Sequence, residues 1–322
     1  MKLGVFTTLF SHMELEEMLD YVQAAGLHAV EIGTGCYPGG SHCNLDLLLE
    51  SEQVRSTYIE HIQKRDLIIS AFSCHGNPLS PDTAFAKESH ETLLKTIQLA
   101  SLLDVPVVNC FSGVAGDHEN AKYPNWPVAP WPNEYNDILK WQWEEKLIPY
   151  WKQVGEFAKE HGVKIGLELH GGFLVHTPYT LLKLREETCN AIGANLDPSH
   201  LWWQGIDPIA AIRLLMKENA IYHFHAKDTY IDQENVNMYG LTDMQPYGKV
   251  KTRAWTFRSV GCGHSLDEWS QMMSALRTYG YDYVVSIEHE DPLMSIQEGF
   301  KRATKNLQSI LIEENPSQIW WV

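Results

Sequence analysis

The sequence predicts an α/β protein in which residues 1–322 form a single (β/α)₈ TIM barrel. Short apolar segments of strand length recur eight times, and most of them are followed by a longer segment with helical periodicity. No G-x-G-x-x-G follows the first apolar segment, which removes the usual signature of a doubly wound open sheet. Apolar strands that alternate with helices indicate a parallel sheet buried on both faces, and eight such units favour closure into a barrel.

The eight predicted strands are too short and too continuously apolar to be separate helices. They are KLGVF (2–6), AVEIG (29–33), LIISAFS (67–73), VPVVNCF (105–111), VKIGLEL (163–169), AIGANL (191–196), AIYHFHA (220–226) and YVVSIE (283–288). Several of these strands carry polar residues near their C-terminal ends, where barrel enzymes place their active sites.

The predicted helices are amphipathic segments between these strands. In the first, Ser11 and Glu14 have the spacing of a capping box, Leu15 begins the apolar face and Gly26 ends the helix. The remaining helices are predicted at roughly 45–65, 86–103, 137–161, 178–188, 207–218, 266–279 and 295–313.

Two connections, residues 112–136 after the fourth strand and 229–265 after the seventh, are too long to be plain loops. The first contains four Pro and two Trp. Because both follow the C-terminal ends of strands, we expect them to be walls or lids of a site, or surfaces that contact a partner. The sequence shows no internal repeat and no linker that would divide the chain into two domains.

The formal net charge of −16 argues against nucleic acid and against an anionic membrane surface as partners, because both select for Lys and Arg. No stretch has the apolar length of a membrane span, and the first residues do not have the pattern of a signal peptide. The six cysteines form no C-x-x-C pair, which favours free thiols and a cytoplasmic location.

Polar residues at the ends of four adjacent strands form the main candidate site. Glu168 and His170 share one face of the fifth strand and its extension, because side chains alternate along a strand. The other strand ends contribute Asp197 and His200 from the sixth strand, His225 and Lys227 from the seventh, and Glu288 and Glu290 from the eighth.

Glu168, Asp197, His225 and Glu288 are the predicted ligands of one divalent metal ion. Three carboxylates and one imidazole suit Mn²⁺, with Mg²⁺ or Co²⁺ as alternatives, better than structural zinc, which favours Cys and His. Each residue alone could be a paired polar group at the barrel rim. Lys227 is expected to face a substrate oxygen, whereas His223, deeper in the strand, is expected to be a hydrogen-bonded core histidine.

With these residues in hand, the chain resembles the xylose isomerase-like superfamily of sugar isomerases and epimerases over its whole length. The resemblance rests on EIGTG, CHGNPL, LELH, NLDPSHLWWQG, HFHAKD, FRSVGCGH and SIEHED. It implies that the four predicted ligands hold one metal, often Mn²⁺, and that His200 and Arg258 contact sugar hydroxyls. In epimerases of the superfamily, paired carboxylates act as the two acid–base groups, and Glu168 and Glu288 match them.

A closer likeness is to the large catalytic subunits of bacterial C-glycoside deglycosidases, which pair with a small β subunit. It rests on GDHENAKYPNWPVAPWP, LKWQWEEKLIPYWK, LELHGGF and NLDPSHLWWQGIDP. It implies elimination from a 3-oxo-C-glucoside, in which loss of the C2 proton is followed by breakage of the C–C glycosidic bond. His170 is the first candidate for the base, with a supporting contact to the metal ligands as its alternative role.

The sequence allows several alternatives for the substrate, the reaction and the partners. The few cations expected near the site, among them Lys227 and Arg258, favour a neutral sugar or glycoside, with His75 and Glu290 as further substrate contacts. Isomerisation or epimerisation of a neutral keto sugar, or sugar binding without catalysis, are the alternatives to elimination. Homo-oligomers are also expected, since NPSQIWWV (315–322) either covers an interface or packs against the barrel.

Aromatic residues in the long connections give one more expectation about the substrate. They could stack on a planar aglycone or instead pack within the fold. The residues concerned are Trp126, Trp131, Trp202, Trp203 and Trp255.

Overall fold

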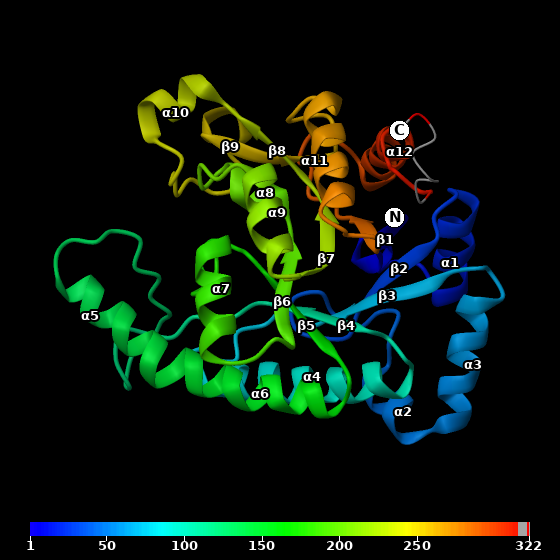
Figure 1. The fold of residues 1–322 in the computed structure, drawn as a ribbon, viewed down its shortest axis with the longest axis horizontal. Coiled ribbons are helices and arrows are strands. Elements are labelled where there is room, and N and C mark those ends of the chain that lie inside the picture. The colour runs from blue at the N-terminus through cyan, green and yellow to red at the C-terminus, as the bar shows by residue number, and fades with distance from the viewer. Residues whose placement is uncertain (315–320, 322) are drawn as a thin grey trace.

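The computed structural model describes residues 1–314 and 321. Within this part of the chain, parallel strands close into a barrel in the order β1-β10-β7-β6-β5-β4-β3-β2, and Lys2 of the first strand pairs with Val284 of the last (Figure 1). The barrel strands are β1 (Lys2–Phe6), β2 (Ala29–Gly33), β3 (Ile68–Ser73), β4 (Val107–Cys110), β5 (Lys164–Glu168), β6 (Ile192–Leu196), β7 (Ile221–Ala226) and β10 (Val284–Ile287). The predicted (β/α)₈ fold is confirmed.

Helices connect the strands and surround the barrel (Figure 1). Their apolar faces are buried, as where α9 buries Ile212 and Leu215 and α11 buries Trp269. They are α1 (Leu15–Ala24), α2 (Leu45–Glu50), α3 (Glu52–Gln63), α4 (Thr83–Leu102), α5 (Glu134–Trp141), α6 (Ile148–Glu160), α7 (Pro178–Glu187), α8 (Pro198–Trp202), α9 (Pro208–Lys217), α10 (Gln233–Tyr239), α11 (Leu266–Thr278) and α12 (Ile296–Gln308).

Two predicted helix features are wrong. Ser11 does not cap α1, because the chain first makes a 3₁₀ turn at Thr7–Phe10 and the Ser11 amide donates to the Thr8 carbonyl. The helix predicted at 45–65 is two helices, since Ser51 leaves helical geometry and its hydroxyl accepts a hydrogen bond from the Val54 amide at the start of α3. In both places a local hydrogen bond sets the boundary.

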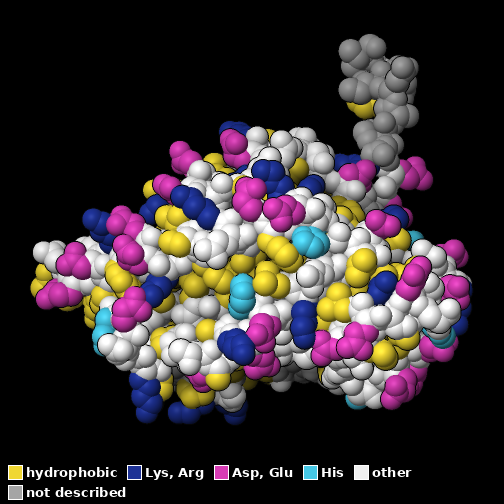
Figure 2. Space-filling model, turned by 90° about the horizontal axis from the view of Figure 1, so that it is seen from below, with side chains coloured by type: hydrophobic (Ala, Val, Ile, Leu, Met, Phe, Trp, Pro, Cys, Tyr) yellow, Lys and Arg dark blue, Asp and Glu magenta, His cyan; other side chains and the backbone are white. Residues whose placement is uncertain are grey.

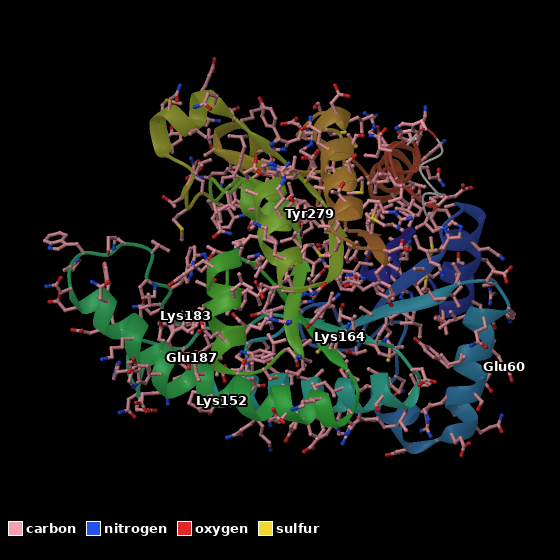
Figure 3. All side chains as sticks on the ribbon, in the orientation of Figure 1. Glu60, Lys152, Lys164, Lys183, Glu187 and Tyr279 are labelled. Carbon is pink, nitrogen blue, oxygen red and sulfur yellow. The ribbon has the colours of Figure 1, made fainter. Side chains whose placement is uncertain are left out.

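The two long connections are structured. The connection after β7 contains α10 and a second sheet, in which β8 (Asp228–Ile231) pairs antiparallel with β9 (Trp255–Arg258). The connection after β4 leads into α5, a π-helical segment at Gln142–Leu147 and α6. Lys183, labelled in Figure 3, belongs to α7. Its Nζ lies over the ring of Trp143, 4.2 Å from the ring centroid, so α7 contacts the π-helical segment.

The interior of the barrel carries a polar cluster among its apolar side chains. Glu31, Asn109, Asn195, His223 and His225 are fully buried there. Gly166 makes room for them, because a Cβ atom on this residue would lie 2.4 Å from Oδ1 of Asn109. The absence of a side chain at Gly166 therefore leaves space for the buried polar side chains inside the barrel.

The cysteines, the helix lengths and the surface charges bear on the expectations about location and partners. All six cysteines are free thiols. In the described residues no helix is both long and apolar enough to cross a membrane. On the face seen in Figure 2, acidic and basic side chains are interspersed.

Candidate metal centre and adjacent cavity

The four predicted metal ligands converge at the C-terminal ends of neighbouring strands. Glu168 ends β5, Asp197 follows β6, His225 belongs to β7 and Glu288 follows β10. One nitrogen or oxygen atom from each side chain lies within 4.8 Å of those from the other three. The strand order of the barrel thus brings together residues spread over more than a third of the chain.

His225 is held between two sets of carboxylates. Its Nδ1 lies 2.9 Å from Oε2 of Glu288 and 3.4 Å from Oε2 of Glu168. Its Nε2 lies 2.9 and 3.0 Å from the two carboxylate oxygens of Glu31. Burial by itself lowers the pKa of His225, but Glu31 and Glu288 outweigh it and raise the pKa well above its ordinary value.

The buried polar atoms of this cluster fit a divalent cation. Oδ2 of Asp197 is buried 3.1 Å from Nζ of Lys227, and Nδ1 of His225 is buried 2.9 Å from Oε2 of Glu288. A divalent cation among these atoms would offset the cost of burying several carboxylates together. Three carboxylates with one imidazole form a donor set suited to Mn²⁺, Mg²⁺ or Co²⁺.

The ligand carboxylates have strongly perturbed pKa values. Burial raises the pKa of Asp197 to about 7, although the Lys227 ammonium opposes the shift. For Glu288 burial acts in the same direction, but Lys227 and His225 outweigh it and lower the pKa to about 2. The pKa of Glu168 is also lowered despite burial, because His75 and His200 lie beside it. Perturbation of this kind is typical of functional sites.

The predicted substrate contacts differ in where they lie. His75 Nε2 is 2.9 Å from Oε2 of Glu168, and His200 Nε2 is 3.0 Å from Oε1, so both rings contact a predicted metal ligand. Lys227 Nζ is buried and lies 3.1 Å from Asp197, 2.9 Å from Glu288 and 2.9 Å from Glu290. Arg258, in contrast, lies on β9, and its Nε pairs with Oδ2 of Asp291 at 3.0 Å.

A cavity of about 500 Å³ adjoins the cluster through two of the predicted residues, His170 and Glu290. His170 is partly buried, and its Nδ1 is hydrogen bonded to the Gly171 carbonyl. Because a carbonyl only accepts, this bond places the ring proton on Nδ1 and leaves the lone pair on Nε2. Burial lowers the pKa of His170, which favours the neutral ring.

The walls of this cavity are aromatic, but they are not the expected Trp residues. The rings of Phe111 and Phe173 are stacked with centroids 4.2 Å apart. Tyr37, Tyr247 and Phe257 also line the cavity, with Thr256 and Pro292. Tyr247 and Phe257 belong to the connection after β7, which therefore forms a wall of the cavity.

The expected Trp residues pack elsewhere in the fold. Trp203 and Trp255 are buried and stack on one another with centroids 4.8 Å apart, and Trp202 stacks on His264. Trp126 contacts His176, and Trp131 is 77% exposed. The stacking surfaces at the cavity are therefore Phe and Tyr rings, which the sequence pattern did not single out.

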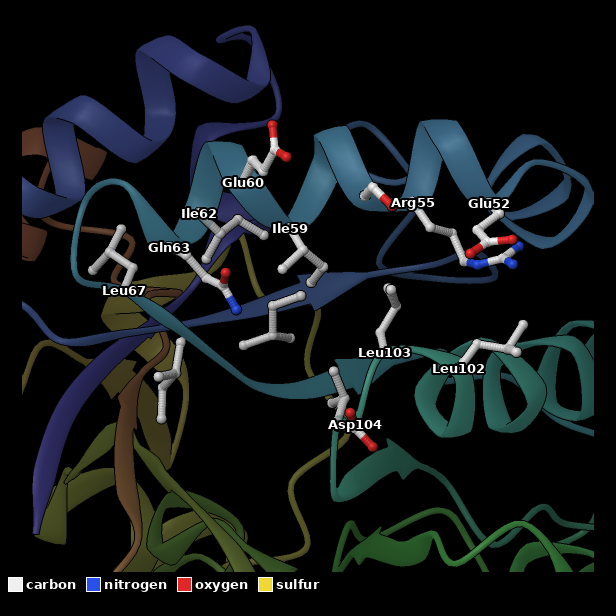
Figure 4. A pocket seen from close by; sticks show the side chains of 14 residues that line it. Glu52, Arg55, Ile59, Glu60, Ile62, Gln63, Leu67, Leu102, Leu103 and Asp104 are labelled. Carbon is white, nitrogen blue, oxygen red and sulfur yellow. The ribbon is translucent and has the colours of Figure 1, made fainter.

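A second cavity, of about 740 Å³, lies at the N-terminal end of the barrel strands (Figure 4). It lies between α3, the end of α4 and the start of β3, and Ile59, Ile62 and Leu103 line it. The N-terminal face of such barrels usually serves stability. The larger cavity is therefore separate from the carboxylate cluster, and the smaller one is the candidate site.

Glu31 is the functional candidate that sequence reasoning missed. It lies in the middle of β2 and is fully buried, and its carboxylate accepts hydrogen bonds from Ser73, Asn109, Ser286 and His225. Its signal in the sequence was an acidic residue inside the otherwise apolar run AVEIG. A charged residue at a core position needs partners, and this one contacts a predicted metal ligand.

A known protein family matches most of the chain. The profile of a family described as xylose isomerase-like TIM barrel matches residues 19–309. Uncharacterized protein YfiH of Bacillus subtilis (strain 168) is 37% identical over 314 residues, which are 97% of this chain and 99% of that protein.

Solved structures with the same fold are more distant in sequence. The probable 3-DHS dehydratase AsbF, involved in petrobactin synthesis, from Bacillus anthracis is 18% identical, with a TM-score of 0.66 over 96% of this chain and 99% of that chain. IOLI protein with a bound zinc atom is 18% identical, with a TM-score of 0.66 over 97% and 98%. A D-tagatose 3-epimerase-like protein is 20% identical, with a TM-score of 0.62 over 96% and 98%.

Proposed function

Because the chain belongs to the xylose isomerase-like TIM barrel family, we propose that it is a divalent-metal-dependent enzyme that removes a proton next to the carbonyl of a sugar. The observation that carries this proposal is the convergence of Glu168, Asp197, His225 and Glu288 beside the cavity that contains His170. The zinc atom of IOLI protein and the epimerase-like relative support metal-dependent sugar chemistry in this fold.

The ligand set would hold Mn²⁺, with Mg²⁺ and Co²⁺ as alternatives. When bound, the cation supplies positive charge next to the substrate oxygens on which negative charge develops during proton removal. Lys227, whose ammonium lies 2.9 Å from both Glu288 and Glu290, adds a second positive charge at the same end of the cavity.

His170 is the proposed base. Its Nδ1 is bonded to the Gly171 carbonyl, so its Nε2 can accept the proton from the carbon next to the carbonyl. The rings of His170 and His200 have centroids 4.0 Å apart, and His200 contacts Glu168. Only the ring of His200 thus separates the proposed base from Glu168. A substrate that contacts the metal could therefore also reach His170.

The favoured reaction is elimination from a 3-oxo-C-glucoside. His170 takes the C2 proton, the C1–C2 double bond forms, and the electron pair of the C1–aryl bond leaves with the aryl carbon, which a general acid protonates. The cavity supports an apolar leaving group, because Phe111, Phe173 and Phe257 line it. Because these walls are apolar, they favour a neutral glycoside over a phosphorylated sugar.

Isomerisation or epimerisation of a neutral keto sugar is the second candidate. It is favoured by two carboxylates, Glu168 and Glu288, that follow or end different strands and both lie beside Nδ1 of His225. In that reaction one group removes the proton and another returns it, so no bond to a leaving group breaks. Lys227 and His200 would hold sugar hydroxyls in either reaction.

The proposed partners are a small β subunit and further copies of the chain. Tyr123 and Trp131, which precede α5, are 67% and 77% exposed, and a partner would cover such surfaces. The C-terminal residues on which the oligomer prediction depended lie outside the described residues, apart from Trp321. A cytoplasmic location, proposed from the free thiols, fits this assignment.

A product assay on the Mn²⁺-supplemented full-length protein tests the function. It uses a 3-oxo-C-glucoside of a phenolic compound and a free 3-keto sugar in deuterated water, each with and without the co-purifying partner. Release of the phenolic compound supports elimination, and deuterium entry without release supports isomerisation or epimerisation. His170→Ala should lose release of the phenolic compound. His176→Ala is the matched control, since His176 follows the same strand but is bonded to Gln204. Metal binding without release or exchange would instead support a sugar-binding barrel.

A further inference from the structure

Glu31 and His225 are joined across the barrel by a pair of short contacts. The carboxylate of Glu31 on β2 lies 2.9 and 3.0 Å from Nε2 of His225 on β7, and both side chains are fully buried. Strands β2 and β7 are not neighbours in the barrel, so this contact crosses its interior.

The carboxylate of Glu31 can only accept hydrogen bonds in this setting. Its Oε1 accepts from the Ser73 hydroxyl at 2.5 Å and from the Asn109 amide at 3.0 Å, and its Oε2 accepts from the Ser286 hydroxyl at 2.7 Å. Hydrogen bonds donated by two hydroxyls and one amide favour the ionised form of the carboxylate. An ionised carboxylate facing Nε2 requires that this nitrogen carry a proton.

The other nitrogen of His225, Nδ1, faces two of the predicted metal ligands. It lies 2.9 Å from Oε2 of Glu288 and 3.4 Å from Oε2 of Glu168. A histidine binds a metal through a deprotonated nitrogen, and a carboxylate on its second nitrogen fixes the tautomer and raises ligand basicity. We propose that Glu31 is the positioning residue that makes His225 a metal ligand through Nδ1.

Glu31 and its two neighbouring histidines do not form a second metal site, although all three lie within 4.8 Å of one another. Both ring nitrogens of His223 are used, since Nδ1 lies 3.2 Å from Oδ1 of Asn195 and Nε2 lies 3.1 Å from Oγ of Ser70. The oxygens of Glu31 are filled by the donors named above. This part of the cluster is a hydrogen-bonded support for His225, and only one ion is expected per chain.

The proposal rests on the metal-dependent function, but its test needs no substrate. Mn²⁺ binding to the full-length protein is measured by the electron paramagnetic resonance signal of free Mn²⁺. Glu31→Gln keeps the size of the side chain and removes its charge, so we expect the Kd to rise by about 10- to 100-fold. Ser70→Ala is the matched control, because it removes a hydrogen bond of the same buried cluster that does not involve Glu31 or His225. Its Kd should stay close to that of the wild type.

A second measurement on the unaltered protein covers the case in which Glu31→Gln fails to fold. Long-range ¹H–¹⁵N spectra of the Mg²⁺-supplemented wild type should show a proton on Nε2 of His225, assigned by loss of its signals in His225→Gln. A proton on Nδ1, or an unchanged Mn²⁺ Kd in folded Glu31→Gln, overturns the role of Glu31 and leaves the proposed function standing. A wild-type protein that binds no Mn²⁺ overturns both. Binding of two ions per chain contradicts the single site inferred here.

Discussion

The ammonium nitrogen of Lys227 lies 2.9 Å from a carboxylate oxygen of Glu290, although Lys227 is buried and half of the Glu290 side chain is exposed. The same nitrogen contacts Asp197 and Glu288. Lys227 therefore connects the buried ligand cluster to the cavity, where Glu290 forms part of the wall. A buried cation among three carboxylates also balances charge that would otherwise oppose folding.

Lys227→Met should destabilise the protein because it leaves Asp197 and Glu288 without their cation. In the presence of a chelator we expect the free energy of unfolding to fall by about 3–5 kcal/mol, the usual cost of breaking a buried pair. Urea unfolding followed by circular dichroism measures the change. Mn²⁺ should restore more stability to the variant than it adds to the wild type. Equal stability of the two proteins with chelator would contradict this account.

Divalent metal should stabilise the wild-type protein and fail to stabilise Asp197→Asn. A ligand present at 100 times its Kd adds about 2.7 kcal/mol to the free energy of unfolding. Thermal unfolding with chelator, Mn²⁺, Mg²⁺ and Co²⁺ in turn measures the gain and ranks the ions. Asp232→Asn is the control, since Asp232 caps α10 away from the cluster. The ligand assignment is wrong if Asp197→Asn gains as much as the wild type.

His170→Gln should reduce kcat without weakening metal binding. A positioned general base contributes about 10²- to 10⁴-fold, so kcat for product release or deuterium exchange should fall by that factor. The Mn²⁺ Kd, measured on the same preparation, should not change, because His170 lies outside the four ligands. A large rise in Kd with an unchanged kcat at saturating metal would assign His170 to support of the metal site instead.

Gly166→Ala should destabilise the barrel interior. Its new Cβ atom would lie 2.4 Å from Oδ1 of Asn109 and 3.3 Å from Cβ of Asn195. Overpacking of this kind costs about 1–3 kcal/mol, which chemical denaturation can measure. Asn109 donates to Glu31, so Mn²⁺ affinity should fall as well. Gly162→Ala is the comparison at a glycine near the same strand, where nothing lies within 4 Å but the positive φ of 69° adds backbone strain without touching the cluster.

Glu16 gives a pH-dependent contribution to stability away from the site. Lys64 and Arg65 lower its pKa from the ordinary 4.5 to about 2. A lowered folded-state pKa stabilises the native state above pH 4.5, and this contribution is lost as the pH falls toward 2. Glu16→Gln should therefore be less stable than the wild type at pH 7, and the difference should shrink at acid pH. Denaturation across this range would refute the assignment if the difference were constant.

The sequence predicted the barrel and its ligand-bearing strand ends because both follow from short-range pattern. Alternation along β5 put Glu168 at a strand end, and chain order put Asp197 and His225 on neighbouring strands. The features that it missed depend on contacts between distant segments. The hairpin of β8 and β9 and the aromatic walls of the cavity arise from packing, which periodicity does not record.

Glu31 is a second residue whose role depends on a contact between distant segments. The sequence pattern did not single out Glu31, because its partner His225 is 194 positions away and comes beside it only in the closed barrel. The role of Arg258 as a substrate contact stays a prediction. The resemblance suggested it from a motif, and the structure adds that Arg258 lies on β9 and pairs with Asp291.

The contact between Glu31 and His225 joins residues separated by 194 positions. All four ligands come from the half of the barrel that starts with β5, whereas the carboxylate that orients one of them comes from the half that starts with β1. Contacts of such long range form late in folding, because loop closure must precede them. A site that holds His225 in the orientation for metal binding therefore requires the complete barrel, because neither half supplies both the ligands and the carboxylate that orients one of them.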